Sequence, residues 1–449
     1  MLDIGIVGSG VPSLYAANML SSKGHNVTIL EAESNPGGLY KNIITKFGNF
    51  DLGCRFISLT ENNDIDNFIN SICSKSKNWK PLKGKKSDIS GCYFEDEFQL
   101  DSSIIDTNNL TKHERDKLLN NITREYPITD EIYPKQNLSL LNYWNNRFGD
   151  FAANKIINNI FIQKFGISAK FISSSCLNIF PVRRLIFTKN VDEILKKNKN
   201  WLYIKASKPH NALPDKLFLN KCAYYPRKVG IGQFVDDSIK ILEKKNVKFV
   251  FNHNINKINI KGEKVITYSE GSNSPKFYDY LIWNAPEKNL KNSLSIKNKD
   301  KKFCSKNFFL LNCILDNATI PKNIYYAYDY SKNTIKNDVN IYRVNYYDNY
   351  SYNGFSKKMV KVSVELTSSI YEKPNAKDII RYLCEKKFIL NYSKINYLNI
   401  IGPFRLPIFM VKDKKINYPK KIINSFNFNY GENTLHHSLI KMDKIISEI

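Results

Sequence analysis

The sequence Gly8-Ser9-Gly10-Val11-Pro12-Ser13 follows an apolar run at 4–7 and opens a segment, 13–23, whose apolar residues recur at helical spacing. Gly24 is a natural helix stop, and residues 27–30 form a second apolar run. The pattern predicts a strand, a glycine turn, a helix and a second strand, which together form the βαβ unit of a dinucleotide-binding domain. The two glycines permit a tight turn and a close approach of phosphates to the helix N-terminus.

The turn and the end of the second strand supply the candidate nucleotide-binding residues. Ser13 occupies the third glycine position of the fingerprint and is small enough for close helix–strand packing. Glu31 follows the glycines by about 20 residues, where a carboxylate can accept hydrogen bonds from ribose hydroxyls. The alternative is an accidental glycine-rich turn, but here the motif has its full structural context. We predict that a nucleotide contacts Gly8, Gly10, Val11, Pro12, Ser13, Glu31 and Ala32.

A second glycine pair and an Arg-containing segment come next. They read Asn35-Pro36-Gly37-Gly38-Leu39-Tyr40 and Phe50-Asp51-Leu52-Gly53-Cys54-Arg55. Taken with Glu31-Ala32-Glu33, they resemble the N-terminus of the FAD superfamily that contains amine oxidases, protoporphyrinogen oxidase, phytoene desaturases and UDP-galactopyranose mutase. The resemblance implies FAD as the cofactor, with Gly37, Gly38 and Leu39 near its pyrophosphate. Many members carry an Arg where this chain has Leu39.

Later segments continue the resemblance in the same order as in the family. They are 225–232 (Tyr-Pro-Arg-Lys-Val-Gly-Ile-Gly), 254–258, 278–286 and 430–433 (Tyr-Gly-Glu-Asn). The resemblance implies that Ile255 contacts adenine and that Gly431, Glu432 and His437 lie near the ribitol or the flavin. A helix N-terminus after this glycine would stabilise negative charge on reduced flavin.

Four residues are candidates for catalysis, each with a structural alternative. Arg55 stands where several relatives have a His near the isoalloxazine, so it could polarise the flavin or hold an anionic substrate, unless it forms a structural ion pair. Arg183, in Pro181-Val182-Arg183-Arg184, is similar to a substrate-facing Arg of the mutase and could grip a pyrophosphate, unless it is a surface cation. Arg405, in Phe404-Arg405-Leu406-Pro407, precedes the flavin-return segment, where relatives often place an active-site Arg. His436 could act as an acid or base, or merely begin a helix.

The element order predicts interleaved domains in an α/β protein. We expect a Rossmann-like FAD-binding domain with a parallel sheet, composed of 1–90, 223–300 and 400–449. An α+β substrate-binding domain of helices and an antiparallel sheet would comprise 91–222 and 301–399.

Composition limits the other roles of the chain. It has 449 residues and a net charge of +25, which could attract nucleic acid, an anionic surface or phosphorylated substrates. The Lys residues are dispersed, so we expect a small-molecule substrate and no nucleic-acid partner. The eight Cys are scattered without metal-ligand spacing, which predicts reduced thiols, no metal site and a cytoplasmic location. No apolar run is long enough to cross a bilayer.

The resemblance implies an FAD-dependent oxidoreductase that transfers a hydride from a small substrate, with an anionic one among the alternatives, to flavin N5. The alternative is a mutase-like isomerase, in which reduced flavin attacks the anomeric carbon of a nucleotide sugar. The Pro-Val-Arg run and the ending Met442-Asp443 favour it; the lack of an Arg after Gly431 counts against it. Substrate identity, electron acceptor and oligomeric state are left open by the sequence.

Overall fold

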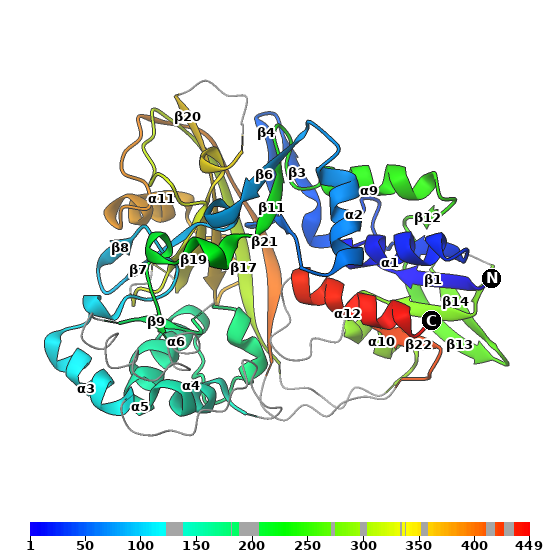
Figure 1. The fold of residues 1–449 in the computed structure, drawn as a ribbon, viewed down its shortest axis with the longest axis horizontal. Helices are drawn as coiled ribbons and strands as arrows, with labels where there is room; N and C mark the ends of the chain where they lie inside the picture. Colours follow the sequence, from blue (N-terminus) through cyan, green and yellow to red (C-terminus); the bar gives the residue numbers. More distant parts are fainter. Residues whose placement is uncertain are drawn as a thin grey trace. The chain divides into compact units, whose positions relative to one another are not determined.

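The computed structural model describes the whole chain except 123–137, 181, 188–205, 271–273, 297–302, 333–334, 337, 352–357, 410–417 and 426–434. The chain forms two compact units, each assembled from separated segments. Unit 1 comprises Met1–Pro81, Cys222–Lys301 and Lys414–Ile449; unit 2 comprises Leu82–Lys221 and Lys302–Asp413. Both units therefore interleave along the sequence (Figure 1).

Unit 1 contains a five-stranded parallel sheet. Its order is β12 (Lys248–Val250), β2 (Asn26–Leu30), β1 (Asp3–Val7), β16 (Tyr280–Trp283) and β22 (Ile422–Asn424). In the register of the central strands, Ile6 lies opposite Ile29 of β2 and Ile282 of β16. All three side chains are fully buried, as expected for a parallel sheet that is covered on both faces.

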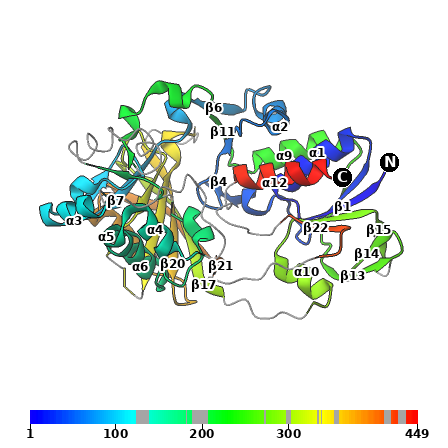
Figure 2. The same ribbon diagram turned by 60° about the horizontal axis from the view of Figure 1, so that its bottom comes forward.

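Helices cover one face of this sheet and an antiparallel sheet covers the other. The helices α1 (Val11–Ser22), α9 (Gln233–Glu243) and α12 (Leu435–Ser447) lie side by side (Figure 2). The opposite face packs against β13 (Ile255–Lys261), β14 (Lys264–Ser269), β15 (Lys276–Tyr278) and α10 (Glu287–Ser293). The core on that side joins Val7 and Leu30 to Ile258 and Leu290.

Shorter elements complete unit 1. They are the 3-10 turn η1 (Gly38–Tyr40), the hairpin β3 (Asn42–Thr45) and β4 (Gly48–Asp51), the sheet of β5 (Ile57–Ser58), β11 (Cys222–Pro226) and β6 (Trp79–Lys83), and helix α2 (Asn63–Cys73). Asn62 is the N-cap residue of helix α2, and its side chain accepts from the N–H groups of Asp64 and Ile65. This is N-capping of the usual kind.

Unit 2 is built on a seven-stranded sheet. Its order is β21 (Lys394–Phe409), β17 (Phe303–Asp316), β20 (Met359–Ser368), β19 (Val339–Tyr346), β18 (Tyr326–Asp329), β7 (Ser90–Phe94) and β8 (Glu97–Gln99). Neighbouring strands are antiparallel except β18 and β7. Helix α11 (Ala376–Glu385) packs Ile379, Ile380 and Leu383 into the core of one face.

The second core of unit 2 is helical. It contains α3 (Lys112–Ile122), α4 (Leu140–Phe148), α5 (Asp150–Ala152), a π-helical turn (Ala153–Asn158) and α6 (Asn159–Phe165), with the short pair β9 (Leu185–Ile186) and β10 (Ala206–Ser207) nearby. Trp144 and Phe161 pack in this core together with Tyr328 and Tyr342 from the large sheet. The predicted α/β fold class, with a parallel sheet and a separate α+β part, is confirmed.

The unit boundaries differ from the predicted ones at two places. The prediction assigned 82–90 and 400–413 to the FAD-binding domain, whereas the contacts put both in unit 2. The reason is strand pairing: β7 joins β18, and β21 runs along β17 as far as Phe303 opposite Phe409. The sequence of a strand does not show which strand it will pair with, and this pairing determines the sheet to which the strand belongs.

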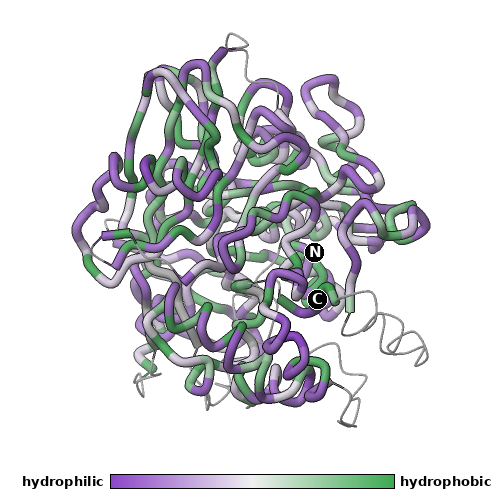
Figure 3. The backbone as a smooth tube through the Cα atoms, turned by 90° about the vertical axis from the view of Figure 1, so that its left-hand side faces the viewer, coloured by the Kyte–Doolittle hydropathy of each residue, from purple (hydrophilic) through white to green (hydrophobic). Residues whose placement is uncertain are grey.

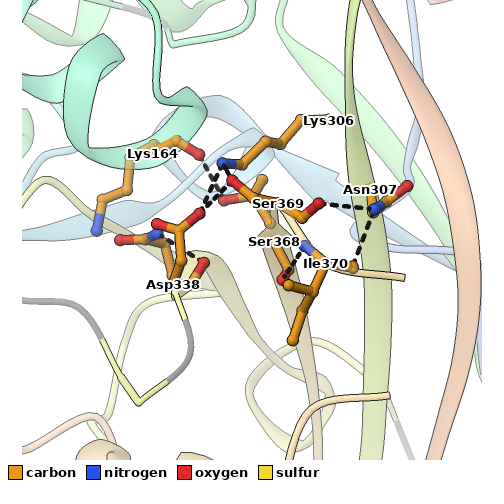
Figure 4. Close-up of polar contacts among 9 residues, drawn as sticks. Lys164, Lys306, Asn307, Asp338, Ser368, Ser369 and Ile370 are labelled. Atoms are coloured by element: carbon orange, nitrogen blue, oxygen red, sulfur yellow. Dashed lines mark hydrogen bonds and ion pairs between the residues drawn. The ribbon is translucent and has the colours of Figure 1, made fainter. Parts of the chain in front are cut away.

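In unit 2, two buried polar side chains of β17 form hydrogen bonds with residues near the ends of neighbouring strands (Figure 4). Lys306 is only 4% exposed, and its Nζ donates to Asp338 Oδ2 at 3.0 Å and to Ser369. The neighbouring Asn307 donates to the backbone oxygen of Ile370 at 2.9 Å. These contacts fix the strand ends. Elsewhere, hydrophilic segments are spread along the described chain rather than gathered in one part of it (Figure 3).

Candidate dinucleotide-binding site

The glycine turn between β1 and α1 adopts a conformation that only a residue without Cβ accommodates at its first position. Gly8 has φ +90°, and a Cβ there would lie 2.5 Å from the backbone oxygen of Asn284. Gly10 is different: the nearest atom to its Cβ would be Asn284 Nδ2 at 3.7 Å. Gly8 is thus required by the fold, whereas the space beside Gly10 is open to a ligand.

The N-terminus of α1 can receive an anion. Gly10 is its N-cap residue in extended conformation, no side chain caps the first turn, and that turn carries no acidic residue. Free N–H groups and the helix dipole favour a negative group at such a position. Val11 is buried and Pro12 is half-buried at the start of the helix, where the fixed φ of proline is suited to the helix.

Ser9 links the turn to the acid at the end of β2. Its backbone N–H and its hydroxyl both donate to Glu31 Oε2, at 2.9 and 2.5 Å, and its hydroxyl accepts from the Gly37 N–H at 3.0 Å. The second carboxylate oxygen, Oε1, accepts from the Glu33 N–H at 2.9 Å. Glu31 is therefore held at the turn before any ribose arrives. Ser9 was not among the predicted site residues.

Ser13 does more than permit close packing. It is fully buried, and its hydroxyl accepts a hydrogen bond from Asn284 Nδ2 at 2.7 Å. Asn284 follows β16, and its backbone N–H donates to the oxygen of Val7 at 2.9 Å. A polar residue directly after a buried apolar strand was the available signal for Asn284. A glycine at position 13 would leave this amide without its acceptor.

The second glycine pair lies against the first. Gly38 has φ +55°, and its Cβ would lie 4.0 Å from Gly10 Cα; Gly37 has φ +105°, and its Cβ would lie 2.9 Å from Val235. The structure thus brings 8–10, Glu31 and 37–38 together; that they bind a nucleotide stays a prediction. Ala32 and Leu39 are exposed next to them, Leu39 to 63%.

The glycines at 230 and 232 are explained by two polar side chains of the β3–β4 hairpin. A Cβ on Gly230 would meet Asn42 Oδ1 at 2.4 Å, and a Cβ on Gly232 would meet Asn42 at 2.8 Å. Asn42 accepts from the Gly232 N–H at 2.8 Å, and the buried Asp51 accepts from the Tyr225 hydroxyl at 2.6 Å. The Asp51 contacts connect the segments 50–55 and 225–232, both of which carry the family resemblance.

Arg55 is a half-buried cation in unit 1. Its Nε is buried without a hydrogen-bond partner, and the described residues provide no carboxylate that pairs with it. Burial raises the pKa of Tyr40 to about 12, although the nearby charge of Arg55 opposes that rise. The structural alternative, an ion pair, is thus not seen in the described part of the chain.

Ile255 begins β13 and is buried in the core with Leu30 and Leu281. It lies just after His253, whose N–H donates to the backbone oxygen of Glu31 at 2.8 Å. The predicted adenine contact therefore lies close in the chain to the predicted ribose acceptor. Burial lowers the pKa of His253, and Lys276 adds to the effect.

The C-terminal candidates are only partly described. Gly431 and Glu432 lie outside the described residues, as does the side chain of Arg405, whose backbone pairs with Asn307. His436 is exposed and His437 half-buried in the first turn of α12, with ring centroids 5.4 Å apart. These positions remain predictions.

Met442 and Asp443 make packing and hydrogen-bond contacts within unit 1. Met442 is fully buried, and Asp443 accepts from the Tyr15 hydroxyl of α1 at 2.5 Å and from Asn62 Nδ2 at 3.0 Å. The carboxylate thus joins α12 to α1 and to the cap of α2.

Arg183 lies in unit 2, half-buried, with its backbone oxygen accepting from Arg147 Nε at 2.9 Å. Pro181 lies outside the described residues. In the part of the chain that the structure describes, no group of three or more His, Cys, Asp or Glu residues could hold a metal ion. No described helix has the length and apolar character needed to cross a bilayer.

These features define a Rossmann-type dinucleotide-binding unit joined to an α+β unit. Residues 6–72 match the family model of the NAD(P)-binding Rossmann-like domain. In fold, the chain is similar to reduced UDP-galactopyranose mutase (15% identity, 100% of this chain and 93% of that chain, TM-score 0.68). It is also similar to a candidate protoporphyrinogen oxidase from Exiguobacterium (12%, 99% and 98%, 0.66) and to putrescine oxidase bound to putrescine (12%, 100% and 98%, 0.59).

At identities of 12 to 15%, the chain shares the fold of these three structures. No curated protein sequence matches the chain significantly.

Proposed function

We propose that the protein is an FAD-dependent oxidoreductase of the amine oxidase and protoporphyrinogen oxidase type, in which unit 1 binds FAD and unit 2 binds a small-molecule substrate. One observation carries the proposal: Gly10 and Gly38 approach each other at the uncapped N-terminus of α1, beside a Glu31 that Ser9 holds in place. The glycines offer space for phosphates, the helix offers positive potential, and the acid offers ribose acceptors.

FAD is favoured over a nicotinamide cofactor by the segments beyond the first βαβ unit, although the matching family model is described by NAD(P). The 37–38 pair adds a second backbone approach next to Gly10. Asn42 and Asp51 then join the following hairpin to the 225–232 segment. A nicotinamide fingerprint needs only the first βαβ unit and its acid. The additional glycine-bearing segments fit a longer dinucleotide.

The residues present fit this cofactor in three roles. The α1 N-terminus would hold the pyrophosphate, Glu31 would accept from the adenosine ribose, and Arg55 would supply a cation to the flavin or to an anionic substrate. When bound, FAD supplies two-electron acceptance of a hydride from a substrate C–H bond. The unpaired Arg55 favours negative charge in its surroundings, because a half-buried guanidinium without a counterion stabilises an approaching anion.

The test begins with an absorption spectrum of the purified full-length protein. We expect a flavin band that persists through gel filtration, and bleaching of that band when a substrate is added without oxygen. Protein that is colourless and stays so after incubation with FAD would exclude the proposal. A protein that retains FAD but is bleached by no compound from a broad amine, alcohol and porphyrinogen library would point to a non-catalytic flavin-binding protein.

A mutase-like isomerase of nucleotide sugars is the second candidate, and the arginines at 183 and 184 favour it. Both are half-buried in unit 2, near Arg147, where they could receive a pyrophosphate. Isomerisation of a nucleotide sugar that occurs only after dithionite reduction would establish this candidate. Sustained oxygen or dye consumption with a substrate would support the oxidoreductase. We propose a cytoplasmic location for either enzyme, on the evidence of the scattered, reduced Cys residues.

A further inference from the structure

Three polar side chains form a row across the large sheet of unit 2. Asn312 of β17 lies directly opposite Ser363 of β20, and Ser363 lies directly opposite Asn345 of β19. The three strands are neighbours in the sheet (Figure 1). Residues opposite each other on adjacent strands point to the same side of a sheet, so these three side chains are neighbours on one face. They are called the polar row below.

The polar row faces away from the apolar core that contains α11. In each strand, the residues before and after the row member belong to that core: Leu311 and Cys313, Val362 and Val364, and Val344 and Tyr346. Successive residues of a strand point to opposite faces, so the polar row points to the second face of the sheet. Such alternation normally leaves the polar residues in water. Here Asn312, Ser363 and Asn345 are all fully buried.

The buried polar row lacks hydrogen-bond partners. Among the described residues, neither Nδ2 nor Oδ1 of Asn312 has a partner, and neither does the Ser363 hydroxyl. Asn345 Oδ1 accepts from the Tyr350 hydroxyl at 2.8 Å, but its Nδ2 has no partner in the described part of the chain. Buried polar groups are almost always hydrogen-bonded to protein, water or a ligand. Three neighbouring side chains without such partners are therefore unusual in a folded protein.

The atoms without partners define the chemistry of a matching ligand. Nδ2 of Asn312 only donates and Oδ1 only accepts, so a ligand that satisfies this side chain must both accept and donate. Hydroxyl and carboxamide groups do both. An ionised carboxylate only accepts and an ammonium group only donates, so each would leave one atom of Asn312 unpaired.

The polar row is longer than one small group. Adjacent strands lie about 4.8 Å apart, so the three side chains span roughly 10 Å. A single hydroxyl cannot contact all three, whereas a molecule that carries several such groups can. The next strand, β21, places the half-buried Asn399 opposite Asn312. The β21 end of the row therefore lies beside a side chain that solvent reaches.

The charged residues beside the polar row already have contacts. Arg343 and Glu365, each two positions from a row member, pair at 2.6 Å. Lys361, on the other side of Ser363, has its Nζ 4.5 Å from the ring centroid of Tyr347. The row itself contains no formal charge, so it offers nothing to offset the desolvation of an ionic group. A neutral ligand suits it better.

We propose that Asn312, Ser363 and Asn345 bind a neutral part of a small molecule that carries several hydroxyl or carboxamide groups. The inference rests on the proposed function, because it names the substrate class of unit 2. Among substrates with a transferable C–H hydrogen, it favours a polyhydroxylated alcohol or an amide-bearing molecule over a simple protonated amine. The polar row consists only of unit 2 residues.

Calorimetric titration of the full-length protein, with FAD in excess, tests the row. The probes are myo-inositol, which presents hydroxyl groups, and malonamide, which presents carboxamide groups. Tighter binding of myo-inositol assigns the row to hydroxyl groups, and tighter binding of malonamide assigns it to carboxamides. Asn312→Leu should weaken binding of the preferred probe about tenfold or more, because it removes a donor and an acceptor.

Asn307→Leu is the matched control on the opposite face of the same strand. Asn307 is buried and donates to the backbone oxygen of Ile370 at 2.9 Å. Its replacement leaves that oxygen without a partner, so the melting temperature should fall by about 2–4 °C while the probe affinity stays unchanged. Asn312→Leu should instead leave the melting temperature of the probe-free protein unchanged or raise it, because the lost atoms have no partner among the described residues.

Three results would overturn the inference. The first is binding of neither probe at millimolar concentration, and the second is wild-type probe affinity in Asn312→Leu. The third is a lowered melting temperature in both Asn312→Leu and Ser363→Ala, since the row would then be held by the protein itself. Ser363→Ala is the smaller change and should weaken probe binding without loss of stability, so it still decides the question if Asn312→Leu fails to fold.

The flavin spectrum separates this inference from the proposed function. A protein that retains no FAD but binds a probe through Asn312 contradicts the proposed function and supports the polar row as a binding site. A protein that retains FAD and binds neither probe does the reverse.

Discussion

Glu31 Oε2 accepts two hydrogen bonds from Ser9, one from its backbone N–H at 2.9 Å and one from its hydroxyl at 2.5 Å. Among the described residues, the other oxygen accepts only from the Glu33 N–H, which leaves a lone pair for a ribose hydroxyl. A carboxylate fixed in this way loses little conformational freedom when a nucleotide binds. Pre-organisation of that kind increases affinity without an added contact.

Glu31→Gln should weaken FAD binding about tenfold, because the amide replaces one acceptor by a donor that faces the N–H of Ser9. Titration of apoprotein with FAD, followed by quenching of flavin fluorescence, measures the effect. Glu33→Gln is the control: Glu33 is exposed and its carboxylate pairs with Lys41, so its change should leave the affinity unaltered. Equal losses in both variants would remove Glu31 from the site.

Gly8→Ala and Gly10→Ala should separate folding from binding. At position 8 the added methyl meets the Asn284 oxygen at 2.5 Å in a left-handed conformation, which should reduce the free energy of unfolding by about 1–3 kcal/mol or more. At position 10 the nearest atom is 3.7 Å away, so stability should be retained while FAD affinity falls. Denaturant unfolding and flavin titration check the pair. Retained affinity in Gly10→Ala would place the phosphates elsewhere.

Tyr15→Phe should reduce the free energy of unfolding by about 1 kcal/mol and leave the flavin spectrum unchanged, because the hydroxyl serves only to hold Asp443. Thermal unfolding of the holoprotein measures the first effect and absorption the second. A large spectral change with unaltered stability would instead give the Met442-Asp443 ending a role at the flavin.

Glu114→Gln should alter the acid stability of unit 2. Glu114 accepts from Thr111 at the start of α3 and pairs with Lys155. Partial burial raises the pKa of Glu114, but these contacts lower it by more, and the resulting pKa is about 2. A carboxylate with a depressed folded-state pKa stabilises the fold above its unfolded pKa and loses that contribution as the pH falls toward 2. The difference in unfolding free energy between wild type and variant should therefore shrink between pH 5 and about pH 3. A constant difference contradicts this account.

Arg55→Met should slow substrate-dependent bleaching of the flavin about 100-fold while FAD stays bound, because a fixed cation near developing negative charge is removed. Stopped-flow reduction without oxygen measures the rate. Arg55→Lys should restore part of it. If the Met variant is reduced at the wild-type rate, Arg55 is a structural residue.

The first βαβ unit and its glycines could be predicted because local sequence determines them. Strand, turn and helix follow from the residue pattern at 4–30, and the backbone at Gly8 has the positive φ that glycine adopts without strain. The boundaries of the units could not be predicted in the same way. Whether residues 400–409 join a parallel or an antiparallel sheet depends on a partner strand some 90 residues earlier in the chain, β17.

The hydrogen bonds inside the site were also beyond sequence reasoning. The sequence around Asn284 does not predict that its side-chain amide donates to Ser13. Likewise, the sequence around Ser9 does not predict that its hydroxyl accepts from the Gly37 N–H and donates to Glu31. These contacts join residues far apart in sequence. Side-chain polarity shows that a partner is needed, but only the fold shows which one.

The parallel sheet of unit 1 has a further consequence, for biosynthesis. Its edge strand β22 comes from residues 422–424, so a ribosome has synthesised residues 1–421 before the neighbouring β16 gains its last partner. Until then β16 presents open backbone groups to other nascent chains. A premature stop shortly before position 422 should therefore yield insoluble material rather than a shortened active enzyme.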